Sequence, residues 1–508
     1  MRALVYSIVS SALLSVAACA PAPAPPAQSN ATVSDARPNI VLIVADDLGW
    51  GDLSSYGGPV TTPNLDQLAR DGVRYTQAYA SAYQCSPSRA GLMTGRYQER
   101  FGHESNFRGP GDGVGGIGLA AGMKAFEEGA LGPTGMGTPR GVPMVSERLK
   151  EAGYHTAMFG KWHLGFDPGM RPRDRGFDEF FGFLAGSTSY ALSNTPDIVS
   201  QSRVGNREGE DDEGMGSSLP DQRSPYYALR DGDGIAADQG GYLTDVLSDR
   251  AVSFIKRQDA RNPFFLYLAH LAPHQPLTAL QRNFDRLPQI TDRRKRIYYA
   301  MILSLDESVG AVRAALREKG LDRNTIVIFT SDNGCPRPGI FCSNGALREG
   351  KQSLYEGGLR VPLIASWPGR LADNSIEDGR VSLLDLAPTF LKAAKAGPDR
   401  NLDGIFLPQA RSADPARALF WRHQVHSAMI EGPWKLIDYA SVEGRRVPFL
   451  FNLSADQGEK MNKADEDPAR VARMRAAMRK WESGLSAPRW VPPNPKRRTY
   501  DGVTVDMY

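Results

Sequence analysis

The chain has 508 residues, of which 41% are hydrophobic and 23% are charged. These fractions are close to the averages of globular proteins, and the length exceeds one ordinary core, so we expect a large domain and a smaller one. The 60 basic and 57 acidic side chains almost cancel. A nucleic-acid-binding protein would show a basic excess or a clustered basic face, so we expect no nucleic acid partner.

The N-terminus has the charged start and the short apolar segment of a secretory signal peptide. Residues 3–18 form that segment, which is too short to span a membrane comfortably. Residues 16–19, Val-Ala-Ala-Cys, resemble the lipobox of bacterial lipoproteins, in which the cysteine is lipidated; an ordinary cleaved signal peptide is the alternative. Residues 20–29 are almost wholly Ala and Pro and predict an extended tether. We therefore expect an exported bacterial lipoprotein, anchored to a membrane through Cys19, in the periplasm or at the cell surface.

Four short apolar segments have the length of a buried strand, and each stops abruptly at polar residues. They cover residues 39–45, 154–159, 264–269 and 325–330. Segments with helical spacing cover residues 62–71, 144–152, 244–257 and 297–319. Buried strands that alternate with helices predict an α/β sheet, in which ligands bind outside the carboxyl ends of the strands. We therefore expect the polar residues after the four strands to converge on one crevice, with separate solvated loops as the alternative.

Oxygen ligands follow the first and the last of these strands. Asp46 and Asp47 come directly after residue 45, and Asp332 and Asn333 come after the last strand. Carboxylate and amide oxygens suit calcium or magnesium far better than zinc, and three clustered carboxylates would repel one another without a cation. We expect one bound Ca²⁺, with Mg²⁺ as the second choice. For Asp46 and Asp47 alone, helix capping or turn chemistry is the alternative.

The chain has four cysteines, Cys19, Cys85, Cys335 and Cys342. If Cys19 is lipidated and Cys85 is chemically converted, two remain, seven positions apart in a loop that contains Pro and Gly. An exported protein meets an oxidising compartment, so we expect a disulfide between Cys335 and Cys342. A two-cysteine metal site is the alternative, but no second Cys or His pair has zinc spacing.

Residues 85–96 read Cys-Ser-Pro-Ser-Arg-Ala-Gly-Leu-Met-Thr-Gly-Arg. Ser86 can cap a helix and Pro87 suits the first helical position, so we expect Cys85 at a helix start whose free amides favour an anion such as a sulfate ester. The segment closely resembles the signature of type I sulfatases, Cys-x-Pro-Ser-Arg followed by Leu-x-Thr-Gly. In that family a dedicated maturation enzyme oxidises the cysteine to Cα-formylglycine. A buried structural cysteine is the alternative.

A formylglycine would give position 85 a chemistry that a thiol lacks. A cysteine attacks sulfur poorly and would leave a stable adduct of the thiosulfate type. A hydrated aldehyde carries two hydroxyls on one carbon: one, activated by the metal, attacks sulfur and expels the alcohol, and the other, once deprotonated, collapses the adduct and releases sulfate. The resemblance therefore implies a sulfuric ester hydrolase in which the converted Cys85 is both nucleophile and metal ligand.

Two further motifs resemble sulfatase elements in the expected order. Residues 160–165, Gly-Lys-Trp-His-Leu-Gly, make Lys161 a sulfate contact and His163 the partner of the formylglycine hydroxyl. Residues 272–276, Ala-Pro-His-Gln-Pro, make His274 the proton donor to the leaving oxygen. These roles are implied by the resemblance.

A third motif completes the implied site. Residues 350–358 resemble the Lys-x-x-x-Tyr-Glu-Gly-Gly element, so Lys351 becomes a second sulfate contact, and Arg89 by the same match holds the formylglycine and the metal ligands. The matches extend over residues 37–484. Taken singly, each lysine has a solvated surface charge as its alternative, and His163 a structural core histidine.

Two other polar residues near these motifs are weaker candidates. His270 precedes His274 by four positions, but the intervening Ala-Pro argues against a helix, so we interpret His270 as structural. Ser187 follows the Phe-Phe-Gly of residues 180–182 and is a possible polar contact by an ambiguous family match.

Two stretches depart from a compact pattern. Residues 109–141 hold twelve glycines, and residues 201–241 include the acidic run 208–213. We expect lids or substrate loops there, with plain disorder as the alternative.

The C-terminal part resembles the small antiparallel subdomain that closes the sulfatase fold. Its expected strands cover residues 418–423, 433–437 and 449–453, and a charged helix follows at 468–484. Arg422 and His423 are candidates to face the substrate, with an exposed strand end as the alternative. The basic run 496–498 is expected to be solvated.

Together these features predict an α/β protein. The large domain is a sandwich with a central, mostly parallel mixed sheet flanked by helices, as in the alkaline phosphatase superfamily, and the smaller domain has an antiparallel sheet and a helix. The expected divisions are a signal peptide (1–18), a tether (19–36), a catalytic domain (37–400) and a C-terminal subdomain (401–508).

The expected function is removal of sulfate from a sulfated poly- or oligosaccharide, with activity on aryl sulfates as well. The expected partners are this substrate, the maturation enzyme and a membrane. The alternatives are a formylglycine-dependent phosphonate or phosphate ester hydrolase and a non-catalytic protein that binds sulfated glycans.

Overall fold

The computed structural model describes residues 36–507, apart from the ranges 108–134, 193–194, 202–226, 238–239, 408–416 and 493–494 and the single residues 196 and 398. The expected signal peptide, Cys19 and the tether lie outside the described residues. So do most of the glycine-rich stretch and the whole acidic run 208–213. Within the described part, none of the helices combines the length and the apolar character needed to cross a membrane.

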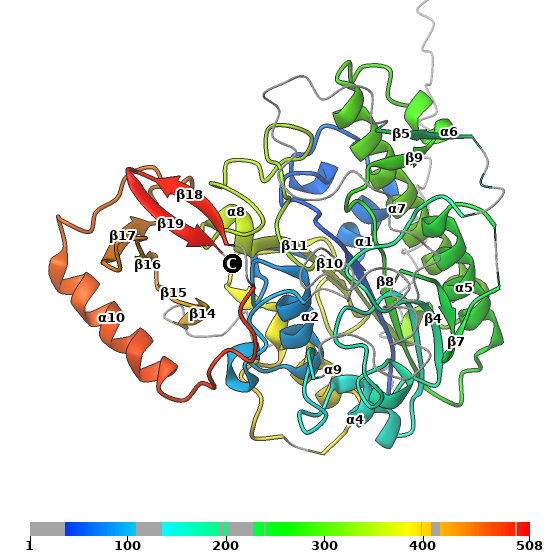
Figure 1. Ribbon diagram of the computed structural model, residues 1–508. Coiled ribbons are helices and arrows are strands. Elements are labelled where there is room, and N and C mark those ends of the chain that lie inside the picture. Colours follow the sequence, from blue (N-terminus) through cyan, green and yellow to red (C-terminus); the bar gives the residue numbers. More distant parts are fainter. Residues whose placement is uncertain are drawn as a thin grey trace, which may run out of the picture. The chain divides into compact units, whose positions relative to one another are not determined.

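An eleven-stranded mixed sheet forms the centre of the described chain (Figure 1). Its strands follow the order β12-β2-β11-β10-β1-β8-β3-β4-β6-β7, and β13 pairs with β2. The five from β10 to β4 are mutually parallel, whereas β11 runs antiparallel between β10 and β2. The strand bounds are β1 Asn39–Ala45, β2 Val73–Tyr79, β3 His155–Lys161, β4 Glu179–Phe183, β6 Arg230–Asp231, β7 Gly234–Ile235, β8 Phe264–Ala269, β10 Thr325–Ser331, β11 Arg360–Ser366, β12 Ser375–Glu377 and β13 Val381–Ser382.

Helices cover both faces of this sheet, and β1 shows why. Its alternate side chains point to opposite faces, so Val41 and Ile43 enter one core while Ile40 and Leu42 enter the other. The first core includes residues of α1, α5 and α7, and the second includes residues of α2, α4 and α9. The helix bounds are α1 Pro63–Arg70, α2 Cys85–Thr94, α4 Val145–Glu151, α5 Leu243–Arg257, α6 Gln281–Asp285, α7 Arg293–Glu318, α8 Glu356–Leu359 and α9 Leu386–Ala393. Short 3-10 helices cover Ser54–Tyr56, Gln98–Phe101, Arg173–Arg175, Asp322–Asn324 and Leu383–Asp385.

A separate antiparallel sheet forms the C-terminal part, as the sequence predicts. Its order is β14-β15-β16-β17, and α10 packs against it through Met474 and Met478. The bounds are β14 Leu419–His423, β15 His426–Glu431, β16 Trp434–Ala440, β17 Arg446–Asn452 and α10 Pro468–Glu482. Two small two-stranded sheets complete the described strands: β5 Ile198–Ser200 with β9 Thr278–Leu280, and β18 Lys496–Tyr500 with β19 Val503–Met507.

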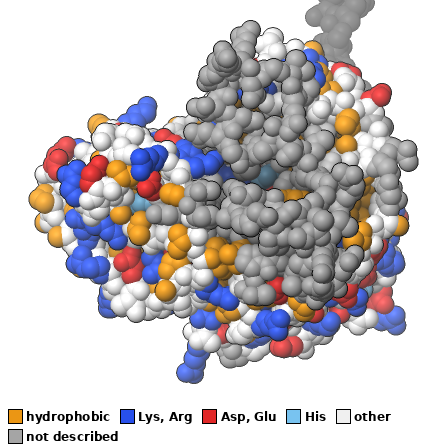
Figure 2. Space-filling model, viewed as in Figure 1, with side chains coloured by type: hydrophobic (Ala, Val, Ile, Leu, Met, Phe, Trp, Pro, Cys, Tyr) orange, Lys and Arg blue, Asp and Glu red, His pale blue; other side chains and the backbone are white. Residues whose placement is uncertain are grey.

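The basic run 496–498 lies in strand β18. Tyr500 and Val505 of this hairpin are buried in the core of the C-terminal sheet, which fixes the strand. The alternating side chain of Arg497 remains exposed, as the two-residue period of a strand requires. Lys and Arg side chains gather on the viewed face over β18 and α10 (Figure 2).

A buried charge network joins the C-terminal sheet to the large sheet. Lys435 of β16 places Nζ 2.9 Å from Glu356 Oε1 and 2.9 Å from Glu459 Oε1. Tyr79 of β2 donates to the other oxygen of Glu356 at 2.8 Å. Because Glu356 begins α8, directly after the loop that carries Lys351, this network fixes the end of that loop.

Most element boundaries differ from the expected ones by a few residues, and two of these differences have a clear structural meaning. Strand β3 continues to Lys161, two residues beyond the predicted end, so Lys161 lies on the strand itself. Helix α7 begins at Arg293 because Asp292 caps it, accepting a hydrogen bond from the amide of Lys295 at 2.8 Å. Strands β2, β4, β11 and β15 are among the strands that have no counterpart in the expected segments.

Candidate active site

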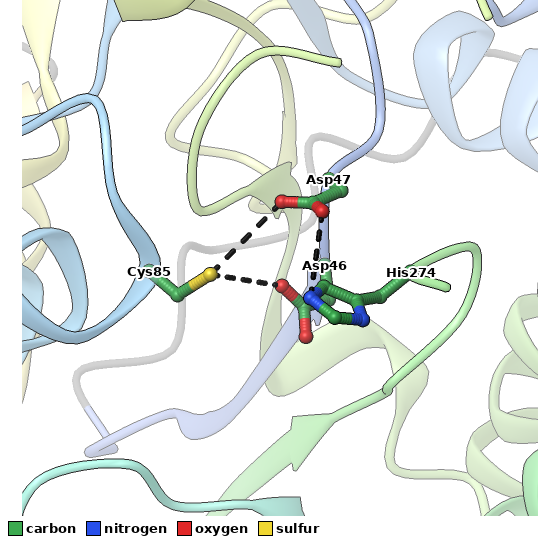
Figure 3. Close-up of side chains that lie close together, drawn as sticks. All are labelled: Asp46, Asp47, Cys85 and His274. Carbon is green, nitrogen blue, oxygen red and sulfur yellow. Dashed lines mark hydrogen bonds and ion pairs between the residues drawn. The ribbon is translucent and has the colours of Figure 1, made fainter. Parts of the chain in front are cut away.

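Four side chains that could share a metal ion lie together at the carboxyl end of the central sheet (Figure 3). Asp46 and Asp47 follow β1, His274 follows β8, and Cys85 begins α2. One ligand atom from each lies within 4.8 Å of the others, and all four residues are buried. The strand-end pattern therefore brings together residues from three distant parts of the chain.

Two buried lysines face this acidic cluster. Lys161, at the end of β3, places Nζ 2.5 Å from Asp46 Oδ2. Lys351 places Nζ 2.7 and 2.9 Å from the two carboxylate oxygens of Asp47. The same nitrogen lies 3.1 Å from Cys85 Sγ. Both expected sulfate contacts therefore lie at the cluster, and neither is a solvated surface charge.

Arg89 adds a third buried cation, one turn of α2 after Cys85. Its Nε and Nη2 each lie 2.8 Å from Asp332 Oδ2, and Nη2 lies 3.9 Å from Asp46 Oδ1. Three carboxylates and three cationic side chains thus balance in a region closed to water. A divalent metal would give this site a net positive charge, which favours an anionic substrate.

Asn333 offers an oxygen that suits a metal ion. Its Nδ2 donates to Asp47 Oδ1 at 2.7 Å, whereas its Oδ1 is buried and has no hydrogen-bond partner among the described residues. The neighbouring Asp332 accepts a hydrogen bond from the amide of Asp47 at 3.2 Å. Because an unpartnered buried carbonyl oxygen is costly, a hard cation beside Asn333 would satisfy it. The predicted oxygen ligands therefore fit a calcium or magnesium ion.

The carboxylates titrate unequally because their surroundings differ. Burial and the charge of Asp46 raise the pKa of Asp332 to about 6, against the opposing charge of Arg89. Burial would also raise the pKa of Asp47, but the charges of Lys351 and His274 outweigh it and bring the pKa to about 2. The repulsion felt by Asp332 is the kind that a bound cation relieves.

Comparisons with known proteins agree with this geometry. A family model described as Sulfatase matches residues 38–396, which is more than half of the chain. The chain belongs to the sulfatase family. It is 35% identical over 475 residues to N-acetylgalactosamine-6-sulfatase from Canis lupus familiaris, which covers 83% of this chain and 81% of the relative. It is 33% identical to human arylsulfatase A over 84% of this chain and 83% of that protein. This sulfatase is therefore a sulfuric ester hydrolase.

Solved structures share its fold. The crystal structure of Ps i-CgsB in complex with k-i-k-neocarrahexaose superimposes with a TM-score of 0.74 at 31% identity, covering 90% of this chain and 95% of the other. The phosphonate monoester hydrolase of Agrobacterium radiobacter superimposes with a TM-score of 0.59 at 21% identity, covering 93% of this chain, and shows the fold alone. The alkaline-phosphatase-like fold predicted from the sequence is therefore confirmed.

Cys85 is a buried cysteine outside the disulfide. Burial raises the pKa of Cys85 far above its usual range, although the charges of Lys161 and Lys351 oppose that rise. The expected role of Ser86 as helix cap is wrong. Helix α2 begins at Cys85 itself, and the Ser86 hydroxyl instead donates to the carbonyl of His163 at 2.6 Å.

His163 is held in an unusual backbone conformation. Its φ of 54° lies in the left-handed region, which costs a residue other than glycine on the order of 1–3 kcal/mol. The ring packs edge-on against Phe107, with centroids 5.1 Å apart. Burial and the charge of Lys161 lower the pKa of His163 far below its usual range, so the imidazole is neutral. Strain at this position is consistent with a functional role.

The two weaker candidates form hydrogen bonds with residues outside the acidic cluster. His270 is fully buried and pairs through Nε2 with the hydroxyl of Ser308 at 2.9 Å, as a structural histidine would. Ser187 donates to the carbonyl of Gln275 at 3.5 Å, beside His274.

The loop closed by the disulfide follows β10 and contacts the backbone of Lys351. Cys335 and Cys342 are joined in the structure, and the amide of Lys351 donates to the carbonyl of Cys335 at 3.0 Å. The disulfide-bonded loop therefore helps to fix the backbone of one of the two lysines.

Arg422 is partly buried and His423 is buried, and both contact the segment after α2. Arg422 places Nη2 2.5 Å from Glu104 Oε1. The ring of His423 is buried against Tyr83 and pairs with the hydroxyl of Ser105 at 3.2 Å. Both residues hold the segment after α2 in place, because buried polar groups need such partners.

Residues 103–107 form part of the site and have no motif in the sequence that marks them. His103 and Asn106 both contact Ser86, next to Cys85. They follow no predicted strand and precede the glycine-rich stretch. Only the folded chain places them beside Cys85.

Gly186 has no side chain, and the ring of His163 occupies the space where its Cβ atom would lie. A Cβ atom at Gly186 would lie 2.8 Å from Cε1 of that ring. Because the ring is buried and its backbone is constrained, we expect Gly186→Ala to lower kcat for sulfate ester hydrolysis by about tenfold or more. The melting temperature should change little. Gly141→Ala is the matched control, since a Cβ there meets nothing within 4 Å. Equal kcat values for the two variants would contradict this role of His163.

Proposed function

We propose that this sulfatase removes sulfate from a sulfated carbohydrate, using a formylglycine made from Cys85 and a bound calcium ion. The observation that carries the proposal is the buried site in which Lys161 and Lys351 meet Asp46 and Asp47 around Cys85. It combines a nucleophile position, cations for the sulfate oxygens and oxygen ligands for a metal. All of these lie around Cys85, the first residue of α2.

Formylglycine would supply at position 85 the hydroxyl that attacks sulfur and the second hydroxyl that releases sulfate. Burial raises the pKa of the Cys85 thiol and so disfavours the thiolate, which is the nucleophilic form of an unmodified cysteine. Lys351 lies 3.1 Å from the sulfur atom and would orient the group that replaces it. Arg89, bound to Asp332, would hold the carboxylates against their mutual repulsion.

His274 is the residue we assign to protonating the leaving oxygen. Its Nδ1 donates to the carbonyl of Gln275 at 2.5 Å, so Nε2 is the nitrogen that faces the cluster, 3.6 Å from Asp47 Oδ2. Because Nδ1–H is fixed, Nε2 must carry a second proton before it can protonate the leaving oxygen, so this role requires the imidazolium form. Burial lowers the pKa of His274 to about 3, and the negative charge of Asp47 opposes that fall.

A sulfated carbohydrate is the substrate class that the relatives favour. One relative is named N-acetylgalactosamine-6-sulfatase, and one similar structure was solved in complex with a neocarrahexaose. Both match more than four-fifths of this chain. Aryl sulfates should serve as surrogate substrates, because the contacts we assign to Lys161 and Lys351 are to the sulfate group.

Calcium is the ion we propose for the oxygen set of Asp46, Asp47, Asp332 and Asn333. Three carboxylates and an amide oxygen suit its preference for many oxygen ligands. After treatment with a chelator, we expect added Ca²⁺ to raise the melting temperature more than Mg²⁺ at equal concentration, and Asn333→Ala to reduce that rise. A larger rise with Mg²⁺ would contradict the choice of calcium, and no rise with either ion would contradict the site.

Substrate ranking tests the reaction itself. We expect the purified enzyme to hydrolyse an aryl sulfate faster than the matched phosphate ester and to release sulfate from sulfated oligosaccharides. Lys351→Ala should lower kcat/KM by about 10²–10³-fold, because it removes one preorganised cation. Lys463→Ala is the control, since Lys463 makes a surface ion pair with Glu466 at 2.7 Å.

Three outcomes would overturn parts of the proposal. Faster phosphate hydrolysis would favour a phosphate or phosphonate ester hydrolase. Glycan binding without any hydrolysis would favour a binding protein. Cleavage of small alkyl sulfates without desulfation of any oligosaccharide would remove the carbohydrate assignment.

A further inference from the structure

A closed ring of hydrogen bonds surrounds the peptide unit after His163. The Ser86 hydroxyl has one proton, and it donates that proton to the carbonyl of His163 at 2.6 Å. The same oxygen lies 2.7 Å from His103 Nε2, so it must accept the Nε2–H of the histidine. His103 Nδ1 is then the acceptor, and the hydroxyl of Thr138 lies 3.2 Å from it. The amide of Thr138 closes the ring by donating to the carbonyl of Leu164 at 2.9 Å.

The segment that carries His103 also binds the first turn of α2 directly. Asn106 Oδ1 accepts a hydrogen bond from the amide of Ser86 at 2.9 Å, and the amide of Asn106 donates to Gln84 Oε1 at 2.9 Å. Both neighbours of Cys85 are therefore tied to residues 103–107. Phe107, at the end of this segment, carries the ring that packs on His163.

These hydrogen bonds affect the position of His163 relative to Cys85. His163 follows β3 and Cys85 begins α2, and the hydroxyl of Ser86 joins α2 to the carbonyl of His163. The left-handed backbone of His163 persists only if its surroundings hold it there. The hydrogen bond from His103 fixes which way the Ser86 hydroxyl points, and thus which carbonyl it holds.

We propose that His103 is a positioning residue of this sulfatase: through Ser86 it sets the place of the His163 ring relative to the nucleophile at position 85. The inference rests on the proposed function and adds to it a residue that contacts neither sulfate nor metal. Burial and the nearby charge of Arg489 lower the pKa of His103 to about 3, so the imidazole keeps one proton near neutral pH. The donor that the ring of hydrogen bonds requires is thus always present.

The test compares two substitutions at position 103. His103→Leu removes the donor while keeping an apolar side chain of fair size, and we expect kcat to fall by on the order of 10²-fold with KM nearly unchanged. His103→Gln can present an amide N–H near the position of Nε2, and we expect it to recover much of the lost kcat. A residue that only filled space would show no such rescue.

A double-mutant cycle with Ser86 tests whether His103 acts through the Ser86 hydroxyl. Ser86→Ala should lower kcat by a similar factor, and the double variant with His103→Leu should be little worse than either single variant, because both remove the same contact. The fraction of residue 85 converted to formylglycine is measured by mass spectrometry in each preparation, and kcat is divided by it, because Ser86 lies inside the maturation motif.

His270→Leu is the matched control. His270 is an equally buried histidine that pairs through Nε2 with a serine hydroxyl, at 2.9 Å, but it makes no contact with α2 in the structure as described. It should lower the melting temperature about as much as His103→Leu and change kcat much less. Equal kcat in His103→Leu and wild type, failure of rescue by His103→Gln, or additive losses in the double variant would each refute the proposal. An inactive wild-type enzyme would instead refute the proposed function.

Discussion

Charge balance at a buried crevice is the constraint on which the site depends. Carboxylates removed from water are strongly destabilising unless opposite charges lie close to them. Here Asp46, Asp47 and Asp332 meet Lys161, Lys351 and Arg89, and each of the six is at least 95% buried. The pairing explains why the cations come from β3, α2 and the loop before α8. Any shift of one element would leave a charge unpaired, so the crevice also fixes how these elements pack.

The rest of the structure holds the cations where that balance needs them. The Lys435 network ties the C-terminal sheet to Glu356, and the disulfide loop contacts the amide of Lys351 from the other side. Arg422 and His423 hold the segment that contains His103. The C-terminal sheet therefore contributes to the site indirectly, because its contacts fix the segments that carry Lys351 and His103.

Much of the fold and the site could be predicted from the sequence, because fully buried strands are continuous apolar runs. The apolar run of β1 is covered on both faces, and its abrupt end at Asp46 marks the crevice. Strand β11 gave no such signal, because Pro362 interrupts it, and the structure has a bulge there between Val361 and Leu363. Strand β2 lies near an edge and alternates polar with apolar residues. His103 could not be predicted, since only tertiary contact places it beside Ser86. Lipidation of Cys19 and export remain predictions from the sequence.

The account depends most on the conversion of Cys85, because the buried thiol is a poor nucleophile while its neighbours suit a sulfate-cleaving group. Mass spectrometry of the peptide that contains residue 85, from enzyme purified in active form, tests this directly. The account predicts that the thiol is replaced by an aldehyde, detectable by its mass and by an aldehyde-specific reagent. A fully active preparation in which residue 85 is an intact cysteine would contradict it.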